Sequence, residues 1–164
     1  MTDPKQPGVR FLLAHPAHLV ALGFGSGLAP FAPGTFGTLF GWWSFNLLES
    51  RLPPAAWPWL LIGGFLIGIA ACSKTGRDLG VADHGGMVWD EIIAIWLVLS
   101  FLPTTAIWQA WGFLLFRLFD ILKPPPIRWF ERRWKGGFGV MWDDLVAAFF
   151  ALLVIALFVR WTRF

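Results

Sequence analysis

Two adjacent acidic pairs and one single aspartate stand where apolar segments of this sequence begin or end. The pairs are Asp90-Glu91 and Asp143-Asp144, and the single residue is Asp120. Neighbouring carboxylates repel one another, and they are costly beside a membrane unless they are paired, solvated or bound to a cation. A divalent cation would explain all five, whereas capping and pairing with Arg or Lys is the simpler explanation for any one of them. Oxygen ligands in a chain with only three histidines favour Mg²⁺ over zinc.

Two basic residues share the expected helix of one of these acids. Arg117, Asp120 and Lys123 follow one another at three-residue steps, which predicts one helix face that ends before Pro124. An Arg-Asp-Lys ladder of ion pairs is the structural alternative. Positive groups beside a metal site are what phosphoryl chemistry requires, so the nearby carboxylates favour a functional role.

Two further segments could contact an anion or a leaving group. Gly23–Gly27 and Ala32–Thr38 are rich in glycine and hydroxyl groups, among them Thr35 and Thr38, and they precede a helix. Their backbone N–H groups could hold an anion, but a close-packed loop is an equal alternative because the Gly-Lys-Ser/Thr ending of a Walker loop is missing. His84 is expected either to serve the reaction as an acid or to make a loop hydrogen bond.

The composition indicates a membrane protein rather than a water-soluble one. Of the 164 residues, 57% are hydrophobic and 14% are charged, whereas a typical soluble domain carries roughly 25% charged residues. The 12 Trp residues belong to the type best suited to a membrane interface. The length suits a single membrane-embedded domain, 1–164, and the few, interrupted basic residues make nucleic acid a poor partner for the net charge of +3.

Five apolar stretches predict an all-α fold, a polytopic membrane bundle of about five short helices. Most stretches are shorter than the roughly 20 residues that cross a bilayer core. The segment Phe11 to Leu22 is interrupted by His15, Pro16 and His18 and predicts an N-terminal interfacial helix, preceded by a flexible tail at 1–9. The five stretches are 36–48, 55–72, 92–102, 106–119 and 145–161.

Alternating the five spans places the five carboxylates and most basic residues on one side. The positive-inside rule makes that side cytoplasmic. Among the basic residues there, Arg128, Arg132, Arg133 and Lys135 are expected to face lipid headgroups. His15 and His18 are expected to contact headgroups or cap a helix, and Asp78 is expected to be a solvated charge at a helix end. The predicted cytoplasmic side holds Lys5, Arg10, Lys74, Arg77, Arg117, Lys123, Arg128, Arg132, Arg133 and Lys135, against Arg51, Arg160 and Arg163 opposite.

Four ordered motifs resemble those of a known family. They are Gly23–Gly27 with Pro33–Thr38, Asp83–Glu91, Phe116–Pro124 and Gly136–Asp144. Together they closely resemble phosphatidylglycerophosphatase A. Members of that family are bacterial inner-membrane, Mg²⁺-dependent lipid phosphatases that convert phosphatidylglycerophosphate to phosphatidylglycerol and inorganic phosphate.

The resemblance implies roles for particular residues of this chain. Metal binding and catalysis fall to the five carboxylates, and substrate binding to Arg117 and Lys123, with Thr35, Thr38 and His84 in the adjoining motifs. The departures from the family pattern concern packing or lipid fit more than chemistry. They are Ala94 and Ala148 in place of glycine, Pro125 in place of an aromatic residue and Trp142 in place of an aliphatic one.

We therefore expect a phosphoric monoester hydrolase of phospholipid biosynthesis, multi-pass in the bacterial cell inner membrane, with its active site on the cytoplasmic face. A small divalent-cation or proton transporter is the alternative, and it would share the carboxylates without needing Arg117 and Lys123. A phospholipid-synthesising transferase would need a nucleotide-linked substrate, for which the sequence has no dedicated motif. The sequence does not distinguish one metal from two, direct attack by water from an aspartyl-phosphate, or one oligomeric state from another.

Overall fold

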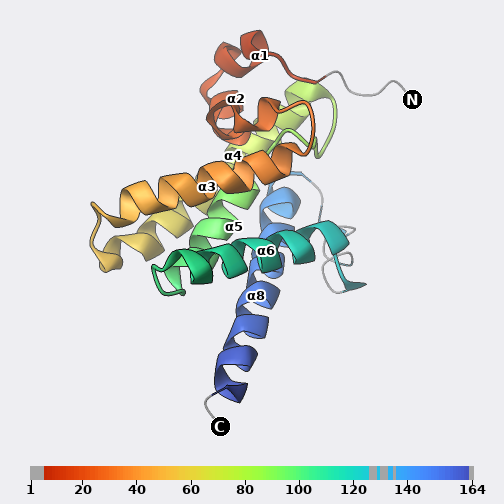
Figure 1. Cartoon of the computed structure of the whole chain (residues 1–164). Coiled ribbons are helices and arrows are strands. Elements are labelled where there is room, and N and C mark those ends of the chain that lie inside the picture. The colour runs from red at the N-terminus through yellow and green to blue at the C-terminus, as the bar shows by residue number, and fades with distance from the viewer. Residues whose placement is uncertain (1–5, 126–128, 130–132, 135, 163–164) are drawn as a thin grey trace.

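The computed structural model describes residues 6–125, 129, 133, 134 and 136–162. The predicted all-α fold is confirmed, since these residues form helices and connecting loops and no strand. Figure 1 shows the arrangement of the helices. In chain order the elements are α1 (Val9–Ala14), α2 (Pro16–Ala21), η1 (Gly23–Leu28), α3 (Pro33–Glu49), η2 (Pro54–Ala56), α4 (Trp57–Leu79), α5 (Trp89–Ser100), α6 (Ala106–Leu122) and α8 (Gly137–Trp161).

Helix α5 is the centre of the bundle. Ten of its 12 residues are buried, and it packs most extensively against α3 and α8. Glycines on the neighbouring helices permit this close approach, because a Cβ at Gly41 would lie 2.5 Å from Ile95 Cγ2 and one at Gly64 would lie 2.4 Å from Ile93 Cδ1. The indole N–H of Trp96 donates to the Gly41 carbonyl at 2.9 Å. This packing fixes the start of α5, which carries two of the predicted site residues.

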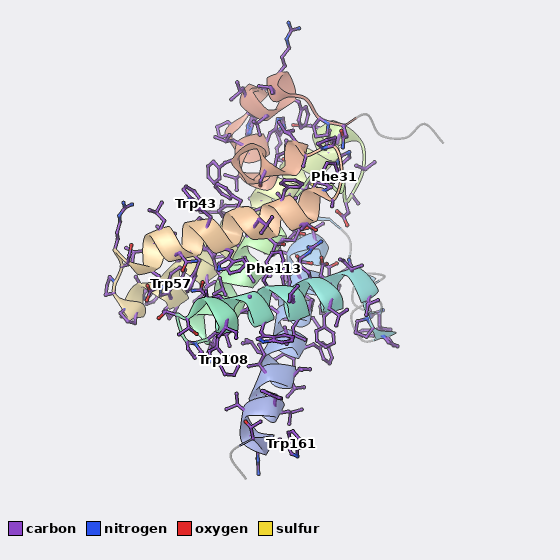
Figure 2. The ribbon with its side chains drawn as sticks, viewed as in Figure 1. Phe31, Trp43, Trp57, Trp108, Phe113 and Trp161 are labelled. Carbon is purple, nitrogen blue, oxygen red and sulfur yellow. The ribbon has the colours of Figure 1, made fainter. Side chains whose placement is uncertain are left out.

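Helices α4 and α8 are the two described helices that are long and apolar enough to cross a membrane. The segments are Pro54–Leu79 and Gly137–Thr162, and only 28% and 22% of their apolar windows are buried inside the protein. The C-terminal half of α8 projects beyond the other helices (Figure 1), and Trp161 lies at its end (Figure 2). Trp59 and Phe149 are 76% and 59% exposed. So much outward apolar surface is rare in a soluble monomer and fits a membrane protein.

The remaining apolar stretches form helices as predicted, but these helices are short. Helix α5 has 12 residues, which is roughly 18 Å of helix against a bilayer core of roughly 30 Å. Helices α3 and α6 have 17 residues each and run across the direction of α8 (Figure 1). The arrangement of five alternating spans therefore stays a prediction.

The N-terminal segment differs from the single interfacial helix that the sequence predicts. Two short helices form, because His15, which precedes Pro16, is extended with φ −154° and ψ 141°. Helix α2 packs against α4. The predicted tail is also too long, since the Gln6 amide donates to two backbone carbonyls ahead of α3 at 3.3 and 3.4 Å. Residues 1–5 of that tail lie outside the described residues.

Candidate active site

Three carboxylates from two helices meet inside the protein. Asp90 and Glu91 lie in the first turn of α5, and Asp144 lies in α8. Ligand oxygens of the three lie within 4.8 Å of one another, and the residues are only 8%, 9% and 3% exposed. The extensive packing of α5 against α8 thus joins acids that are far apart in the sequence.

The negative charge of this carboxylate cluster is poorly compensated by the described side chains around it. Among the described residues, Asp90 Oδ1, Glu91 Oε2 and Asp144 Oδ2 are buried without a hydrogen-bond partner. Burial raises the pKa of Asp90 well above its usual value, and the neighbouring carboxylates of Glu91 and Asp144 add to the effect. Burial also raises the pKa of Glu91, to about 7. A helix N-terminus favours one negative charge modestly, so buried and unpartnered oxygens of this kind fit a hard divalent cation such as Mg²⁺.

Arg117 of α6 borders the carboxylate cluster. Its Nη1 lies 2.6 Å from Asp120 Oδ2 and 3.7 Å from Glu91 Oε1. The same nitrogen donates to the Thr38 hydroxyl at 3.3 Å, and that hydroxyl donates to the Gly34 carbonyl at 2.7 Å. The predicted Arg117-Asp120 face is confirmed, and α3 contributes Thr38 to it.

Lys123 reaches the site from just outside α6. It is the C-cap residue with a left-handed φ of 40°, because the following Pro124 disfavours a helical conformation. The prediction that it continues the helix face of Arg117 and Asp120 is therefore wrong in local geometry. Its Nζ nevertheless lies 2.6 Å from Asp143 Oδ2 of α8, so the side chain points into the site.

The two adjacent aspartates of α8 contact different groups. Asp143 pairs with Lys123, whereas Asp144 joins Asp90 and Glu91. The expectation that both begin the helix is wrong, because α8 starts at Gly137 and the pair lies inside it. Gly136, with φ 81°, precedes the first turn of α8, and the glycines from Gly137 onward are helical.

The start of α3 lies directly against the carboxylate cluster. A Cβ at Gly34 would lie 2.2 Å from Glu91 Oε1 and 3.2 Å from Arg117 Nη2. A larger residue there would displace the Glu91 carboxylate or the Arg117 guanidinium, a role that the Pro-Gly-Thr motif alone did not reveal. Thr35 lies in the same turn and is partly buried, and its contact with substrate stays a prediction.

The other polar residues singled out in the sequence have mainly structural contacts. His84 Nδ1 accepts a hydrogen bond from the Gly86 N–H at 3.0 Å, so the loop alternative has direct support and a role toward substrate stays a prediction. A Cβ at Gly27 would lie 2.0 Å from the Gly86 carbonyl oxygen, which supports close packing for the Gly23–Gly27 segment.

The N-terminal polar residues make capping and ion-pair contacts. His18 is buried, so the headgroup expectation is wrong for it, but its Nδ1 contacts the Phe11 carbonyl in the last turn of α1, which fits the capping alternative. Asp78 is an exposed charge at the end of α4, as expected, and it also pairs with His18 Nε2 at 2.6 Å. These residues are distant in the sequence, which hid the pair. His15 caps α2 by accepting from the Ala17 N–H at 3.0 Å. In the expected headgroup patch Arg133 is exposed, while Arg128, Arg132 and Lys135 lie outside the described residues.

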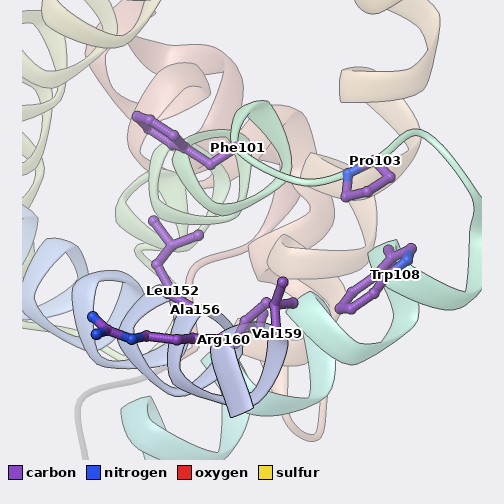
Figure 3. A pocket seen from close by; sticks show the side chains of 8 residues that line it. Phe101, Pro103, Trp108, Leu152, Ala156, Val159 and Arg160 are labelled. Atoms are coloured by element: carbon purple, nitrogen blue, oxygen red, sulfur yellow. The ribbon is translucent and has the colours of Figure 1, made fainter. Parts of the chain in front are cut away.

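A larger cavity lies away from the site. It has a volume of about 750 Å³ and lies between the end of α5 and the C-terminal half of α8 (Figure 3). Its lining is apolar except for Arg160, and Val159 is roughly 22 Å along α8 from Asp144. A smaller cavity of about 320 Å³ adjoins the site and includes polar residues. It is lined by Ala82, Asp83, Trp134, Gly136, Gly139, Val140 and Asp143.

Comparison with known proteins points to one family. The family model described as Phosphatidylglycerophosphatase A matches residues 19–159, which include all five carboxylates. A Phosphatidylglycerophosphatase A of Escherichia coli is 47% identical over 139 residues, covering 84% of this chain and 80% of the relative. One from Haemophilus influenzae is 44% identical over 164 residues, covering 98% and 99%.

A third relative has a different name. A Bacteroides thetaiotaomicron protein, provisionally named a phosphatidylinositol-3-phosphatase, is 38% identical over 150 residues, covering 87% of this chain and 92% of the relative. No solved structure matches the chain. Since the family model covers most of the chain and two relatives are 44% and 47% identical over most of both lengths, the chain belongs to the phosphatidylglycerophosphatase A family of phosphatases.

Proposed function

We propose that this chain hydrolyses the terminal phosphate of phosphatidylglycerophosphate in an Mg²⁺-dependent reaction of phospholipid biosynthesis. The observation that carries the proposal is a buried cluster of three carboxylates bordered by Arg117 and Lys123. The names of the E. coli and H. influenzae relatives support the choice of substrate. The outward apolar surfaces of α4 and α8 support a location in the bacterial inner membrane, with the charged helix ends on the cytoplasmic side.

Asp90, Glu91 and Asp144 are the residues that would hold Mg²⁺. Their unpartnered oxygens supply the hard ligands that this ion prefers. Asp120, which shares Arg117 with Glu91, and Asp143, which adjoins Asp144 in the sequence, are the further candidate ligands for one ion or two. When bound, Mg²⁺ neutralises phosphate charge and makes water a better nucleophile. The remaining chemistry belongs to the side chains around this cluster.

Arg117 and Lys123 would bind the phosphate oxygens. Arg117 Nε is buried and has no hydrogen-bond partner among the described residues, so it keeps a donor for a phosphate oxygen. The Lys123 ammonium is a charged donor beside Asp143, with its Nζ 2.6 Å from Asp143 Oδ2. Both cations would stabilise the charge that develops on the transferred phosphoryl group.

Asp120 is placed to accept a proton from water or to serve as a further ligand. Its Oδ2 accepts from Arg117 at 2.6 Å, which orients the carboxylate next to the site. Attack through an aspartyl-phosphate is the alternative route. Brief reaction with labelled substrate followed by acid quenching distinguishes the two, because direct attack by water leaves no labelled protein.

The cavity beside Asp143 offers room for the glycerol part of the headgroup. Its volume of about 320 Å³ is at the lower end of small-molecule sites. The acyl chains of the substrate would remain in lipid beside the apolar faces of α4 and α8, so that only the headgroup enters the protein.

Phosphate release from defined lipids tests the proposal. Purified protein in mixed micelles would be given phosphatidylglycerophosphate, phosphatidylinositol 3-phosphate or phosphatidic acid, each with Mg²⁺ or chelator. We expect release from phosphatidylglycerophosphate that the chelator abolishes and that Asp144→Asn lacks. Faster phosphate release from the inositol lipid would overturn the proposed substrate. Full activity in chelator would overturn the proposed Mg²⁺ dependence. Cation uptake into liposomes without phosphate release would favour a transporter.

A further inference from the structure

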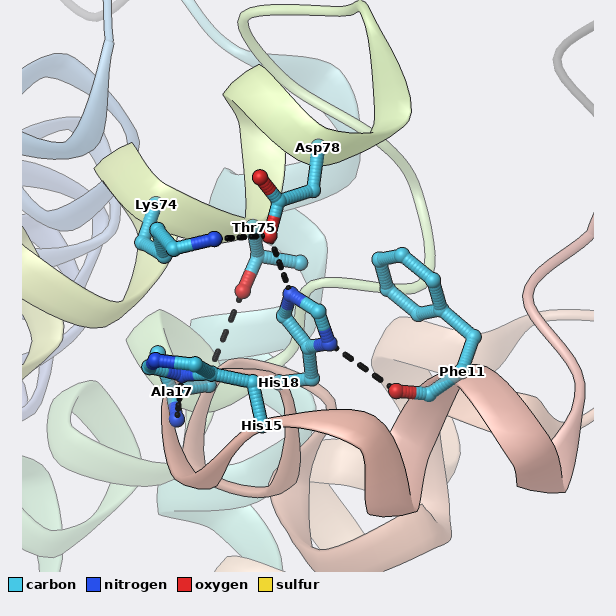
Figure 4. Close-up of polar contacts among 7 residues, drawn as sticks. All are labelled: Phe11, His15, Ala17, His18, Lys74, Thr75 and Asp78. Carbon is cyan, nitrogen blue, oxygen red and sulfur yellow. Dashed lines mark hydrogen bonds and ion pairs between the residues drawn. The ribbon is translucent and has the colours of Figure 1, made fainter.

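His18 is a buried histidine that the proposed chemistry does not use. Figure 4 shows its ring between α1 and α4, with each nitrogen directed at an oxygen. Nδ1 lies 2.9 Å from the Phe11 carbonyl oxygen, and Nε2 lies 2.6 Å from Asp78 Oδ2. The ring also stacks on that of Phe11, with centroids 4.0 Å apart. His18 is 4% exposed, so water does not replace these partners.

The two partners determine the protonation state of the ring. A backbone carbonyl can only accept a hydrogen bond, so Nδ1 must carry a proton. Asp78 Oδ2 also accepts from the Lys74 ammonium, which identifies it as an ionised carboxylate, so Nε2 must carry a proton as well. A ring with two donors is the imidazolium cation. His15 differs, because its Nδ1 accepts from the Ala17 N–H and must be unprotonated.

Helix α2 connects this pair to the start of the catalytic helix. It ends at Ala21, one turn after His18, and the Ala21 carbonyl accepts from the Val88 N–H at 2.8 Å. Val88 is the N-cap residue of α5, directly ahead of the turn that carries Asp90 and Glu91. A displacement of α2 would therefore move the anchor of both carboxylates.

We propose that His18, held as an imidazolium between Phe11 and Asp78, is a positioning residue for the phosphatase reaction. It fastens α2 to α4, and through the hydrogen bond from Val88 to Ala21 it sets the position at which α5 begins. The kinetic part of this inference rests on the proposed function, whereas the charge state of the ring does not. Neutral His18 would lose one of its two hydrogen bonds, and the Asp78 carboxylate would lose a charged partner.

Nuclear magnetic resonance of the full chain in detergent, with ¹⁵N-labelled histidine, tests the charge state. His18→Asn and His15→Asn assign the signals. At neutral pH we expect both ring nitrogens of His18 to be protonated and one nitrogen of His15 to be unprotonated. An unprotonated nitrogen on His18 in the wild-type chain would overturn the inference directly.

Kinetics and hydrogen exchange test the positioning. We expect His18→Asn to lower kcat roughly tenfold with little change in KM, and to speed exchange of the Val88 amide. His15→Asn is the matched control, because asparagine preserves the cap and both readouts should stay near wild type. Asp78→Glu should retain more activity than Asp78→Asn, since it keeps the charge.

The outcomes separate this inference from the proposed function. If His18→Asn kept the wild-type kcat and the wild-type exchange rate of the Val88 amide, the positioning role of His18 would be overturned, whichever lipid is the substrate. A wild-type protein that releases no phosphate from any lipid would overturn the proposed function, and the charge state of His18 and the exchange of Val88 would still decide whether the residue anchors α5.

Discussion

Replacing Glu91 by glutamine should stabilise the metal-free protein while abolishing its activity. Glu91 is 9% exposed, and its Oε2 has no hydrogen-bond partner among the described residues. Burial raises its pKa from 4.5 to about 7, so the folded protein disfavours the ionised carboxylate when no cation is bound. An amide of the same shape removes this penalty but provides a poorer ligand for Mg²⁺.

The pKa of Glu91 gives the magnitude of the stabilisation. Between 4.5 and about 7 the difference is about 2.5, which corresponds to roughly 3 kcal/mol at neutral pH. Because the folded pKa is the higher one, the unfolded chain loses its proton first as the pH rises. The Glu91 contribution to the stability of the metal-free protein therefore falls between pH 4.5 and about 7 and is constant above. For a chain of this size, roughly 3 kcal/mol shifts Tm by about 6–12 °C.

Thermal unfolding in detergent measures the effect. Wild type, Glu91→Gln and Glu49→Gln would be compared with chelator and again with Mg²⁺. Glu49 lies at the exposed end of α3, which makes it a matched control with an expected change in Tm near zero. In chelator we expect Glu91→Gln to have the highest Tm, and added Mg²⁺ should raise the Tm of wild type and of Glu49→Gln only.

A lower Tm for Glu91→Gln than for wild type in chelator would refute this reasoning. It would mean that the attraction of ionised Glu91 to Arg117, 3.7 Å away, outweighs the cost of burial. An equal rise in Tm with Mg²⁺ in the variant would instead show that Glu91 is not needed to hold the ion.

Three further substitutions test the site. Asp144→Asn should lower the phosphatase rate at least roughly 100-fold and remove the rise in Tm with Mg²⁺, because a ligand is lost. Gly34→Ala should lower the rate roughly 100-fold, since its Cβ would lie 2.2 Å from Glu91 Oε1, whereas Gly63→Ala, with open space around its Cβ, should keep the rate. Lys123→Gln should raise KM roughly tenfold by removing a charged hydrogen bond to phosphate. Initial rates across substrate and Mg²⁺ concentrations measure the changes in rate and KM, and thermal unfolding with and without Mg²⁺ measures the change in Tm.

Each of these results has a contrary outcome. Normal turnover by Asp144→Asn would show that α8 does not contribute a required metal ligand through Asp144. A fully active Gly34→Ala would show that α3 is not close to the carboxylate cluster. Unchanged kcat and KM for Lys123→Gln would show that this ammonium does not contact the phosphate.

The apolar pattern of the sequence predicted the five long helices because each forms one continuous hydrophobic stretch. It predicted their ends less well. Helix α8 begins at Gly137, ahead of the apolar residues, since glycine and aspartate belong to a helix when packing supports them. Helix α6 ends before Lys123 because of Pro124, a local effect that the sequence does contain. The N-terminal break at His15 and Pro16 has the same local origin.

The sequence predicted which residues form the site, but it did not predict which of them contact one another. Charge at helix ends identified Arg117, Asp120 and the carboxylates, because such groups are costly near a membrane without a function. Their division could not be read from spacing, since Asp143 and Asp144 are neighbours yet one contacts Lys123 and the other joins the carboxylate cluster. That division depends on how α8 is rotated against α5 and α6, and tertiary packing alone sets this rotation.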